Sequence, residues 1–276
     1  MAATVSSVKL ERLHAVVAST GGAVVAFSGG TDSALVAAVA ARALGSRALA
    51  VTAVSPSLPP GELHEARRVA QAVGIRHRSV RTHEVEREAY LANGPDRCYH
   101  CKTELYGVLE RVAADEALPT VLSGANVDDL GDWRPGLRAA AEHAVRHPLV
   151  EAGLTKSEVR EAALELGVPS WDKPASACLS SRIEHGVRIT VEDLTRVGRA
   201  ERALKELGFR QVRVRVHGDV ARVEVEAAEL GRLASPGVRE RAVRVLRDLG
   251  FRYVTMDLEG FRSGSMNPPE AGNPVG

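Results

Sequence analysis

Aromatic side chains are scarce, since Phe, Trp and Tyr together make up 4% of the 276 residues. Proteins that hold single-stranded nucleic acid stack its bases on aromatic side chains, and this chain has too few for such a platform. An excess of positive charge is also lacking, because 36 Lys and Arg face 35 Asp and Glu. We therefore expect no nucleic-acid partner, although a local basic patch could hide in the average.

Long apolar runs are absent too, although 45% of the residues are hydrophobic and can form a core. No run is long enough to span a membrane. Met1–Val5 lacks the basic and then apolar pattern of a signal peptide. Three cysteines, an odd number, do not make a disulfide framework. We expect a cytoplasmic protein without a membrane partner, whose cysteines are thiols, metal ligands or catalytic groups.

The most informative stretch runs from an apolar segment at 24–27, through a loop of small residues, into an apolar helix at 34–44. The loop consists of Ser28, Gly29, Gly30, Thr31, Asp32 and Ser33. Glycines let backbone N–H groups turn inward, hydroxyl groups donate, and a helix N-terminus adds positive charge, so the loop fits a phosphate chain. Asp32 fits there if a Mg²⁺ ion bridges carboxylate and phosphate. The alternative is an ordinary glycine turn.

The pattern Ser-Gly-Gly-x-Asp-Ser resembles the PP-loop of the ATP pyrophosphatases, which cleave ATP between the α and β phosphates. It lacks the lysine of the Gly-x-x-x-x-Gly-Lys loop found in enzymes that cleave the γ-phosphate. The resemblance implies that ATP, with Mg²⁺, binds at residues 28–33.

Strand-like and helical segments alternate over the first half of the chain. Strands are expected at 24–27, 47–54, 75–80 and 120–124, and helices at 6–20, 34–44, 62–73 and 102–114. This alternation predicts an α/β fold with a doubly wound parallel sheet. Ligands of such sheets bind beyond the carboxyl ends of the strands. Residues 28–33, Ser55 and 123–129 should therefore converge, with Asn126 and Asp128 holding the nucleotide or its Mg²⁺. For 123–129 the alternative is a solvated turn.

The pattern changes in the second half of the chain. A capping box at 155–158 opens a helix that ends near Gly167. A helix at 191–207, a hairpin of strands at 211–216 and 220–225, a helix at 238–249 and a strand at 251–258 follow. We predict three regions: a PP-loop domain at 1–184, a smaller α+β domain for substrate binding or oligomerisation at 185–263, and a disordered tail at 264–276.

The cysteines fall into two groups. Cys98 and Cys101 form a Cys-x-x-Cys near a helix start, and one such pair cannot fill a four-thiolate zinc site. They are a redox pair, two of three cluster ligands, or buried thiols. Cys178 lies among small residues with Lys173 and Arg182 nearby in sequence. A neighbouring cation would lower the pKa of its thiol and make it a nucleophile; the alternative is a structural cysteine.

Four segments occur in the same order in the LarE family, and the resemblance spans nearly the whole chain. They are Ser-Gly-Gly-Thr-Asp-Ser at 28–33, Arg-Cys-Tyr-His-Cys-Lys at 97–102, Ala-Cys-Leu-Ser-Ser-Arg at 177–182 and Arg-Ser-Gly-Ser-Met-Asn at 262–267. LarE proteins are ATP-dependent sulfur transferases that help build the nickel-pincer nucleotide cofactor of lactate racemase. The resemblance also implies a homo-oligomer, specifically a hexamer.

The resemblance implies that ATP adenylates a carboxylate of pyridinium-3,5-biscarboxylic acid mononucleotide and that Cys178 then displaces AMP. Cleavage of the cysteine's own C–S bond leaves a thiocarboxylate on the substrate and dehydroalanine in the protein. Other family members are thought to hold a [4Fe-4S] cluster with three cysteines, which Cys98, Cys101 and Cys178 match. The sequence leaves both roles of Cys178 open.

Arg213 and Arg215 share one face of their strand, because strand side chains alternate. Two guanidinium groups there fit the phosphate of the mononucleotide, with a solvated sheet face as the alternative. Two rival functions also fit the sequence. One is a tRNA-thiolating PP-loop enzyme, and the other is a nucleotide-binding module without catalysis.

Overall fold

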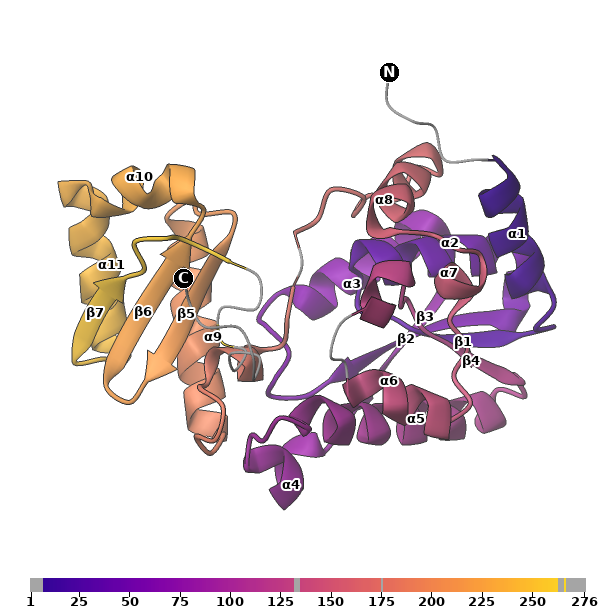
Figure 1. Ribbon diagram of the computed structural model, residues 1–276, viewed down its shortest axis with the longest axis horizontal. Helices are drawn as coiled ribbons and strands as arrows, with labels where there is room; N and C mark the ends of the chain where they lie inside the picture. The colour runs from indigo at the N-terminus through magenta and orange to yellow at the C-terminus, as the bar shows by residue number, and fades with distance from the viewer. Residues whose placement is uncertain (1–6, 132–134, 175, 263–265, 267–276) are drawn as a thin grey trace. The chain divides into compact units, whose positions relative to one another are not determined.

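The computed structural model describes residues 7–131, 135–174, 176–262 and 266. The chain divides into two compact units, of which the first comprises 1–84 and 96–176 and the second 85–95 and 177–276 (Figure 1). The predicted boundary at 184/185 lies close to the passage at 176/177, but no sequence pattern indicated that 85–95 joins the second unit. The predicted tail at 264–276 lies outside the described residues except for Met266.

The first unit contains a parallel four-stranded sheet in the order β3-β2-β1-β4. Its strands are β1 (Ala23–Ala26), β2 (Ala48–Val54), β3 (Arg76–Arg81) and β4 (Thr120–Leu122). The central strands β1 and β2 are almost wholly apolar, as strands covered on both faces must be. The edge strand β3 carries three arginines, which discourage pairing with another chain. The predicted parallel sheet is confirmed.

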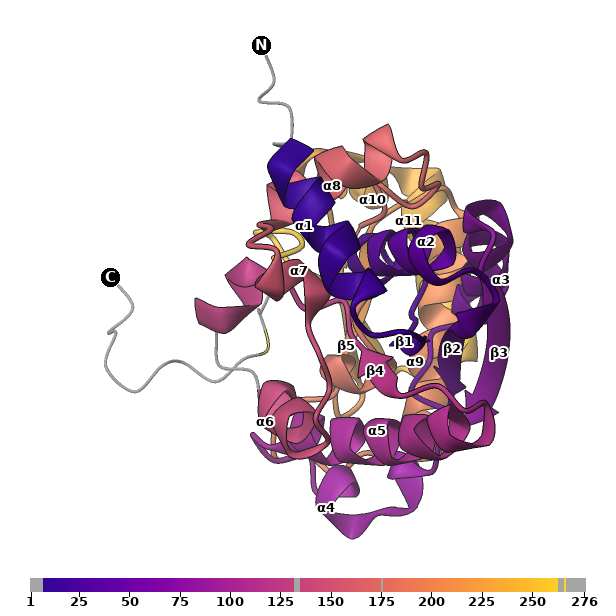
Figure 2. The same cartoon turned by 90° about the vertical axis from the view of Figure 1, so that its right-hand side faces the viewer.

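Helices cover both faces of this sheet (Figures 1 and 2). One face packs against α1 (Ser7–Ala18), α2 (Thr31–Leu44), α3 (Glu62–Val73), α7 (Pro148–Glu151) and α8 (Lys156–Glu165). The other packs against α5 (Arg97–Asp115) and α6 (Pro135–Glu142). Helix α5 begins at Arg97, earlier than the predicted residue 102, and Asp96 occupies its N-cap position without a capping hydrogen bond from its side chain. The Cys-x-x-Cys pair therefore lies in the first turns of α5.

The second unit has the predicted order of helix, hairpin, helix and strand, with a three-stranded sheet β5-β6-β7. Its elements are α4 (Glu88–Leu91), η4 (Leu179–Arg182), α9 (Val191–Glu206), β5 (Val212–His217), β6 (Val220–Val225), α10 (Leu230–Ala234), α11 (Pro236–Asp248) and β7 (Tyr253–Met256). Strands β5 and β6 are antiparallel, and β7 joins β6 in parallel. Strand β7 is shorter than predicted because Phe251 lies in the core rather than in the sheet.

No helix in the described ranges combines the length and apolar character needed to cross a membrane. This finding agrees with the lack of long apolar runs in the sequence.

Candidate nucleotide site and cysteine loop

The loop between β1 and α2 can be built only with glycine at its tightest point. Gly29 has a φ of +73°, and a Cβ atom there would lie 2.8 Å from the Cα atom of Ala66 in α3. Both the backbone conformation and the close approach of α3 exclude a side chain. A small-residue loop is thus pressed between the sheet and α3 at the carboxyl end of β1.

Hydroxyl groups and the N-terminus of α2 shape the inside of this loop. The Ser33 hydroxyl accepts from the Ser28 N–H at 3.2 Å and donates to the Gly30 carbonyl at 3.1 Å, and the Ser28 hydroxyl accepts from the Gly30 N–H at 3.2 Å. Among the described residues, no side chain caps the N-terminus of α2. Its first N–H groups and the positive end of the helix dipole are available to an anion. This is the geometry expected for a phosphate cradle.

Asp32, in the first turn of α2, connects the loop to the end of β4. Its Oδ1 accepts a hydrogen bond of 3.0 Å from Nδ2 of Asn126, which is buried. The Oδ1 of Asn126 in turn accepts from the Asp128 N–H at 3.0 Å. A Cβ atom on Gly124 would lie 2.7 Å from the Ser33 nitrogen, so the end of β4 packs directly on the start of α2. The predicted convergence of 28–33 with 123–129 is present in the structure.

Lys156 is a site residue that the sequence reasoning missed. Its ammonium group pairs with Oδ2 of Asp32, and its backbone N–H donates to Oδ2 of Asp128 at 2.9 Å. Lys156 is the first residue of α8, fixed there by the predicted capping box of Thr155 and Glu158, which the structure confirms. The signal in the sequence was the lysine inside that capping box, which drew attention only as a helix start.

The carboxylate of Asp32 also fits a magnesium ion. Its side chain is 24% exposed, so a ligand can reach it, and carboxylate and amide oxygens are the donors that Mg²⁺ prefers. Lys156 keeps this carboxylate neutralised when no divalent cation is bound. Asp32 is therefore the group that would hold a nucleotide-bound Mg²⁺, and Asn126 orients its carboxylate through the Nδ2 hydrogen bond.

Ser55 lies after β2, but its hydrogen bonds lead away from the phosphate loop. Its hydroxyl donates to Oε1 of Glu84 and contacts the Ser57 hydroxyl at 2.8 Å, and Ser57 donates to the same Oε1 at 2.9 Å. Glu84 is 2% exposed, and its Oε2 has no hydrogen-bond partner among the described residues. Glu84 was not a candidate from the sequence, because it begins a charged stretch that continues with Glu86, Arg87 and Glu88 and gives no sign of burial.

None of the three cysteines is in a disulfide. Cys98 is exposed at the start of α5, Cys101 is half-buried one turn later, and Cys178 is half-buried at the N-terminus of η4. Over the described ranges, no three His, Cys, Asp or Glu side chains are arranged to hold a metal ion. Lys173, expected near Cys178, pairs with Glu62 of α3 at 2.8 Å.

Comparison with known proteins bears on the same features. A model of the asparagine synthase family matches residues 15–124, which contain the phosphate loop. An uncharacterized protein of Synechocystis is 47% identical over 94% of this chain and 97% of its own length. The pyridinium-3,5-bisthiocarboxylic acid mononucleotide synthase of Lactiplantibacillus plantarum is 40% identical over 88% of either chain. The chain belongs to the LarE family.

An uncharacterized protein of Methanocaldococcus jannaschii is a more distant relative, 28% identical over 87% of this chain and 90% of its own. The matches to LarE relatives extend well beyond the asparagine synthase segment and include the second unit. The second unit is therefore part of what this chain shares with its LarE relatives, whereas the asparagine synthase match covers only the segment with the phosphate loop.

Arg182 holds the backbone around the third cysteine of this LarE family member. Its guanidinium group is 1% exposed and forms two hydrogen bonds, of 2.7 and 3.0 Å, with the carboxylate of Glu201 in α9. It also donates to the carbonyl groups of Ala177 at 3.0 Å and Cys178 at 2.9 Å. Arg182 therefore fixes the backbone at residues 177 and 178, and the buried carboxylate of Glu201 neutralises its charge.

Arg213 and Arg215 are buried, so the alternative of a solvated sheet face is wrong. Arg215 pairs with Glu224 across the hairpin at 2.8 Å and donates to the Ser181 carbonyl at 2.9 Å. Burial first, and then the nearby Arg182 charge, lower the pKa of Arg213 to about 10. The sequence left a solvated face open as the alternative because residue alternation does not show what α9 and η4 cover.

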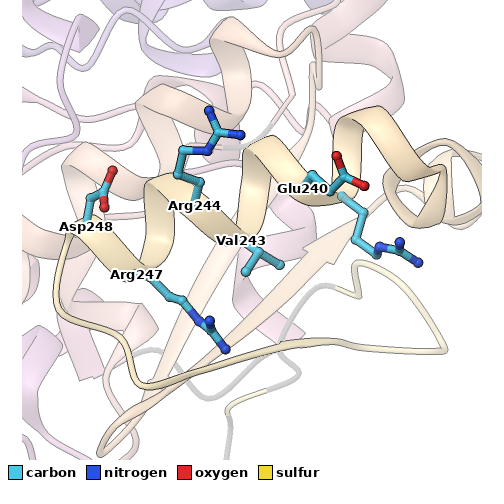
Figure 3. A pocket seen from close by; sticks show the side chains of 6 residues that line it. Glu240, Val243, Arg244, Arg247 and Asp248 are labelled. Carbon is cyan, nitrogen blue, oxygen red and sulfur yellow. The ribbon is translucent and has the colours of Figure 1, made fainter.

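A hollow on the second unit lies along the exposed side of α11 (Figure 3). It is lined by Arg239, Glu240, Val243, Arg244, Arg247 and Asp248, all from this one helix. Its lining contains neither a cysteine nor any residue of the phosphate loop, so we assign the hollow no part in the ATP or sulfur chemistry.

Proposed function

We propose that the protein is an ATP-dependent sulfur transferase that converts a carboxylate of pyridinium-3,5-biscarboxylic acid mononucleotide into a thiocarboxylate. The observation that carries the ATP half is the cluster of Asp32, Asn126 and Lys156 beside the uncapped N-terminus of α2. The relative named as a synthase of the bisthiocarboxylic product supports the sulfur half. We propose the smaller second unit, which holds Cys178 and the buried arginines, as the substrate-binding unit.

In the adenylation step, a substrate carboxylate oxygen attacks the α-phosphorus of ATP and pyrophosphate leaves. The N–H groups at the start of α2 and the hydroxyl of Ser28 hold the leaving phosphates, while the hydroxyls of Thr31 and Ser33 donate to the carbonyls of Ser170 at 2.7 Å and Gly30 at 3.1 Å and so fix the loop. Lys156 offsets their negative charge. A Mg²⁺ ion held at Asp32 would neutralise the developing charge on the phosphate oxygens. The product of this step is an acyl adenylate, which a thiolate can attack.

In the sacrificial scheme, the Cys178 thiolate attacks the acyl carbon and AMP leaves. A base then removes the Cα proton of the cysteine, the Cβ–S bond breaks, and the sulfur stays with the substrate as a thiocarboxylate. Residue 178 remains as dehydroalanine. Thiolates are strong nucleophiles at neutral pH, and a half-buried thiol in a fixed loop can serve this purpose.

In the alternative scheme, Cys98, Cys101 and Cys178 hold a [4Fe-4S] cluster, which would supply an exchangeable sulfide. The support is chemical: three thiols outside disulfides are the type of ligand that such a cluster takes. Cys98 and Cys101 directly follow one passage of the chain between the units, and Cys178 directly follows another. We favour this scheme because all three cysteines of the chain belong to the set.

Arg213 and Arg215 are the groups we propose for the phosphate of the mononucleotide. Arg215 is balanced by Glu224, while the pKa of Arg213 is lowered first by burial and then by the charges of Arg182 and Arg215. A phosphate dianion would relieve this crowding of positive charge. The protein is further proposed to act in the cytoplasm as a homo-oligomer, a hexamer as the family resemblance implies.

Loss of single cysteines tests the sulfur half of the proposal. Cys178→Ala should stop thiocarboxylate formation, followed by mass spectrometry, while ATP binding persists. If the cluster scheme holds, anaerobic protein carries about four irons per chain, and Cys98→Ala or Cys101→Ala loses iron and activity together. If Cys178 is consumed, both variants still complete one turnover and the spent protein is lighter by one hydrogen sulfide. Sulfur transfer by Cys178→Ala would refute the proposed function.

A further inference from the structure

Residues 85–95 leave the first unit and pack with the second, which contains the cysteine loop. Two polar side chains of this segment are enclosed there, Tyr90 at 1% and Asn93 at 0% exposure. Buried polar groups in folded proteins are hydrogen-bonded almost without exception, because an unmade bond costs free energy. The partners of these two side chains show what the segment holds in place.

Tyr90 reaches the segment that follows Cys178. Its hydroxyl group hydrogen-bonds the hydroxyl group of Ser180, which is 0% exposed and lies in η4. Water cannot replace either partner at this depth, so loss of one hydroxyl leaves the other without this hydrogen bond in the interior. The position of η4, and with it the position of Cys178 at its N-terminus, therefore depends on Tyr90.

Asn93 holds the same segment a few residues later. It adopts a φ of +56°, a conformation that asparagine tolerates better than most residues. Its side-chain amide donates to the carbonyls of Glu184 at 2.8 Å and Val187 at 2.9 Å. Its own carbonyl accepts from the Gly186 N–H at 3.0 Å. These three bonds fix the chain directly after η4.

The Cys178 loop, defined as residues 177–187, is thus held from two sides. Arg182 and Arg215 bind backbone carbonyls of the loop and are themselves paired with Glu201 and Glu224. The 85–95 segment supplies the other side through Tyr90 and Asn93. These bonds do not use the Cys178 sulfur, so they fix the loop and leave the thiol available for chemistry. A reacting atom that is held in the productive orientation reacts faster than one that samples many orientations.

We propose that Tyr90 and Asn93 are positioning residues that present Cys178 for sulfur transfer. This inference rests on the proposed function, in which Cys178 is the residue that handles sulfur. The proposed role explains why residues 85–95 pack with the second unit rather than with the first. The Tyr90 hydroxyl is the critical group, because Tyr90→Phe removes one oxygen atom and keeps the buried ring.

The test compares the rate of a single sulfur-transfer turnover in wild type and Tyr90→Phe. We expect the rate to fall about tenfold, which corresponds to roughly 1.4 kcal/mol in the barrier. The rate at which iodoacetamide alkylates Cys178 should also differ between Tyr90→Phe and wild type, because the thiol is no longer held in the same orientation. Mass spectrometry of the peptide that contains Cys178 measures this rate. The KM for ATP should stay the same, because the ATP-binding residues belong to the first unit. A purely structural role would not produce this split between the two half-reactions.

Matched variants separate the hydrogen bond from general effects. Tyr253→Phe makes the same change at an exposed tyrosine of the same unit and should leave both rates unaltered. Ser180→Ala should also slow sulfur transfer, and the double variant should lose less than the product of the two single effects, because both substitutions remove the Tyr90–Ser180 hydrogen bond. Asn93→Gly, which keeps the backbone conformation but loses the amide, should also slow sulfur transfer.

Two outcomes overturn the inference. One is a wild-type rate of sulfur transfer in folded Tyr90→Phe and Ser180→Ala, and the other is a double variant that loses the product of the two single effects. If Tyr90→Phe does not fold, Ser180→Ala decides alone. Failure of the proposed function is recognised separately, because the wild type would then transfer no sulfur to the mononucleotide, or Cys178→Ala would still transfer it, whatever the Tyr90 variants do.

Discussion

Lys156 stands beside the phosphate loop with its ammonium group on Asp32. An aspartate in an anion cradle repels phosphate unless a cation accompanies it, and a lysine from another element supplies one charge in advance. We expect that a nucleotide which brings Mg²⁺ to Asp32 frees the Lys156 ammonium group to contact the phosphates. The loop alone would therefore bind ATP less well than the loop with α8.

Lys156→Met should weaken ATP binding about tenfold or more, since a hydrogen bond to a charged group contributes about 1.5–3 kcal/mol. The dissociation constant of ATP–Mg²⁺, measured by calorimetry, provides the readout. Lys9→Met is the control, because Lys9 pairs with Glu158 of the same helix at 2.7 Å and has a similar exposure. Equal affinity in the two variants would contradict a phosphate-binding role for Lys156.

Arg215 and Glu224 form a pair that is almost completely buried. Arg215→Ala removes one of two cationic partners of a carboxylate that is 0% exposed and leaves Arg222 at 3.3 Å from it, so it should lower the free energy of unfolding by about 3 kcal/mol, the lower end of the cost of a broken buried pair. Arg215→Met combined with Glu224→Leu removes both charges and should recover most of this loss. Urea unfolding of the single and double variants gives the comparison; equal stability of the two would show that the pair does not behave as a buried ion pair.

Arg213 and Arg215 also show what single side chains disclose in a sequence. Their shared face followed from strand alternation and is correct. The burial of both arginines and the pairing of Arg215 with Glu224 were not foreseen. Glu224 comes within reach of Arg215 only because the hairpin register sets Glu224 opposite Arg213, two residues away on the same face. For the same reason, Glu84 and Tyr90 carried no signal: burial is decided by elements that are distant in sequence.

At the level of helices and strands, α8 connects local sequence to the site. The capping box at Thr155 and Glu158 fixes where the helix begins, and the first residue of that helix is Lys156. A helix that frayed by one turn would no longer hold the ammonium group on Asp32. The N-cap thus contributes both to stability and to the geometry of the phosphate loop.

Thr155→Ala should lower the free energy of unfolding by about 0.5–2 kcal/mol, the usual cost of a lost N-cap. It should also raise the KM for ATP, because Lys156 loses its fixed position. Thr190→Ala provides the control: Thr190 caps α9 in the second unit by accepting from the Asp193 N–H at 3.0 Å. That variant should lose a similar amount of stability with an unchanged KM. A raised KM in both variants would argue against a specific effect of α8.

Element order was predictable because each segment of the parallel sheet and of the second unit carries its own periodicity and its own turn residues. The first and last residues of the elements were less predictable than their order. The start of α5 was placed too late because the stretch from Cys98 to Cys101 was interpreted as a motif rather than as the first turns of a helix. Asp96 occupies the N-cap position of this helix but makes no capping hydrogen bond, so the sequence held no strong signal for the start at Arg97.

For the molecule as a whole, the decisive feature is that the chain passes between its two units at 84/85, 95/96 and 176/177. Periodicity cannot reveal such an excursion, because α4 is short and its packing depends on buried partners such as Asn93 and Ser180. The fold class and the phosphate loop followed from local patterns, whereas the support of the Cys178 loop emerged only from the tertiary hydrogen bonds. This difference explains which parts of the site the sequence could supply.

Activation of the carboxylate of a pyridinium mononucleotide by ATP is the step on which the proposed function depends. The direct measurement is pyrophosphate release from ATP–Mg²⁺ with pyridinium-3,5-biscarboxylic acid mononucleotide, with tRNA or with no acceptor. We expect release with the mononucleotide alone, and none in folded Asp32→Ala. Release that requires tRNA, or tight ATP binding without any pyrophosphate in the presence of the mononucleotide, would contradict the proposed function.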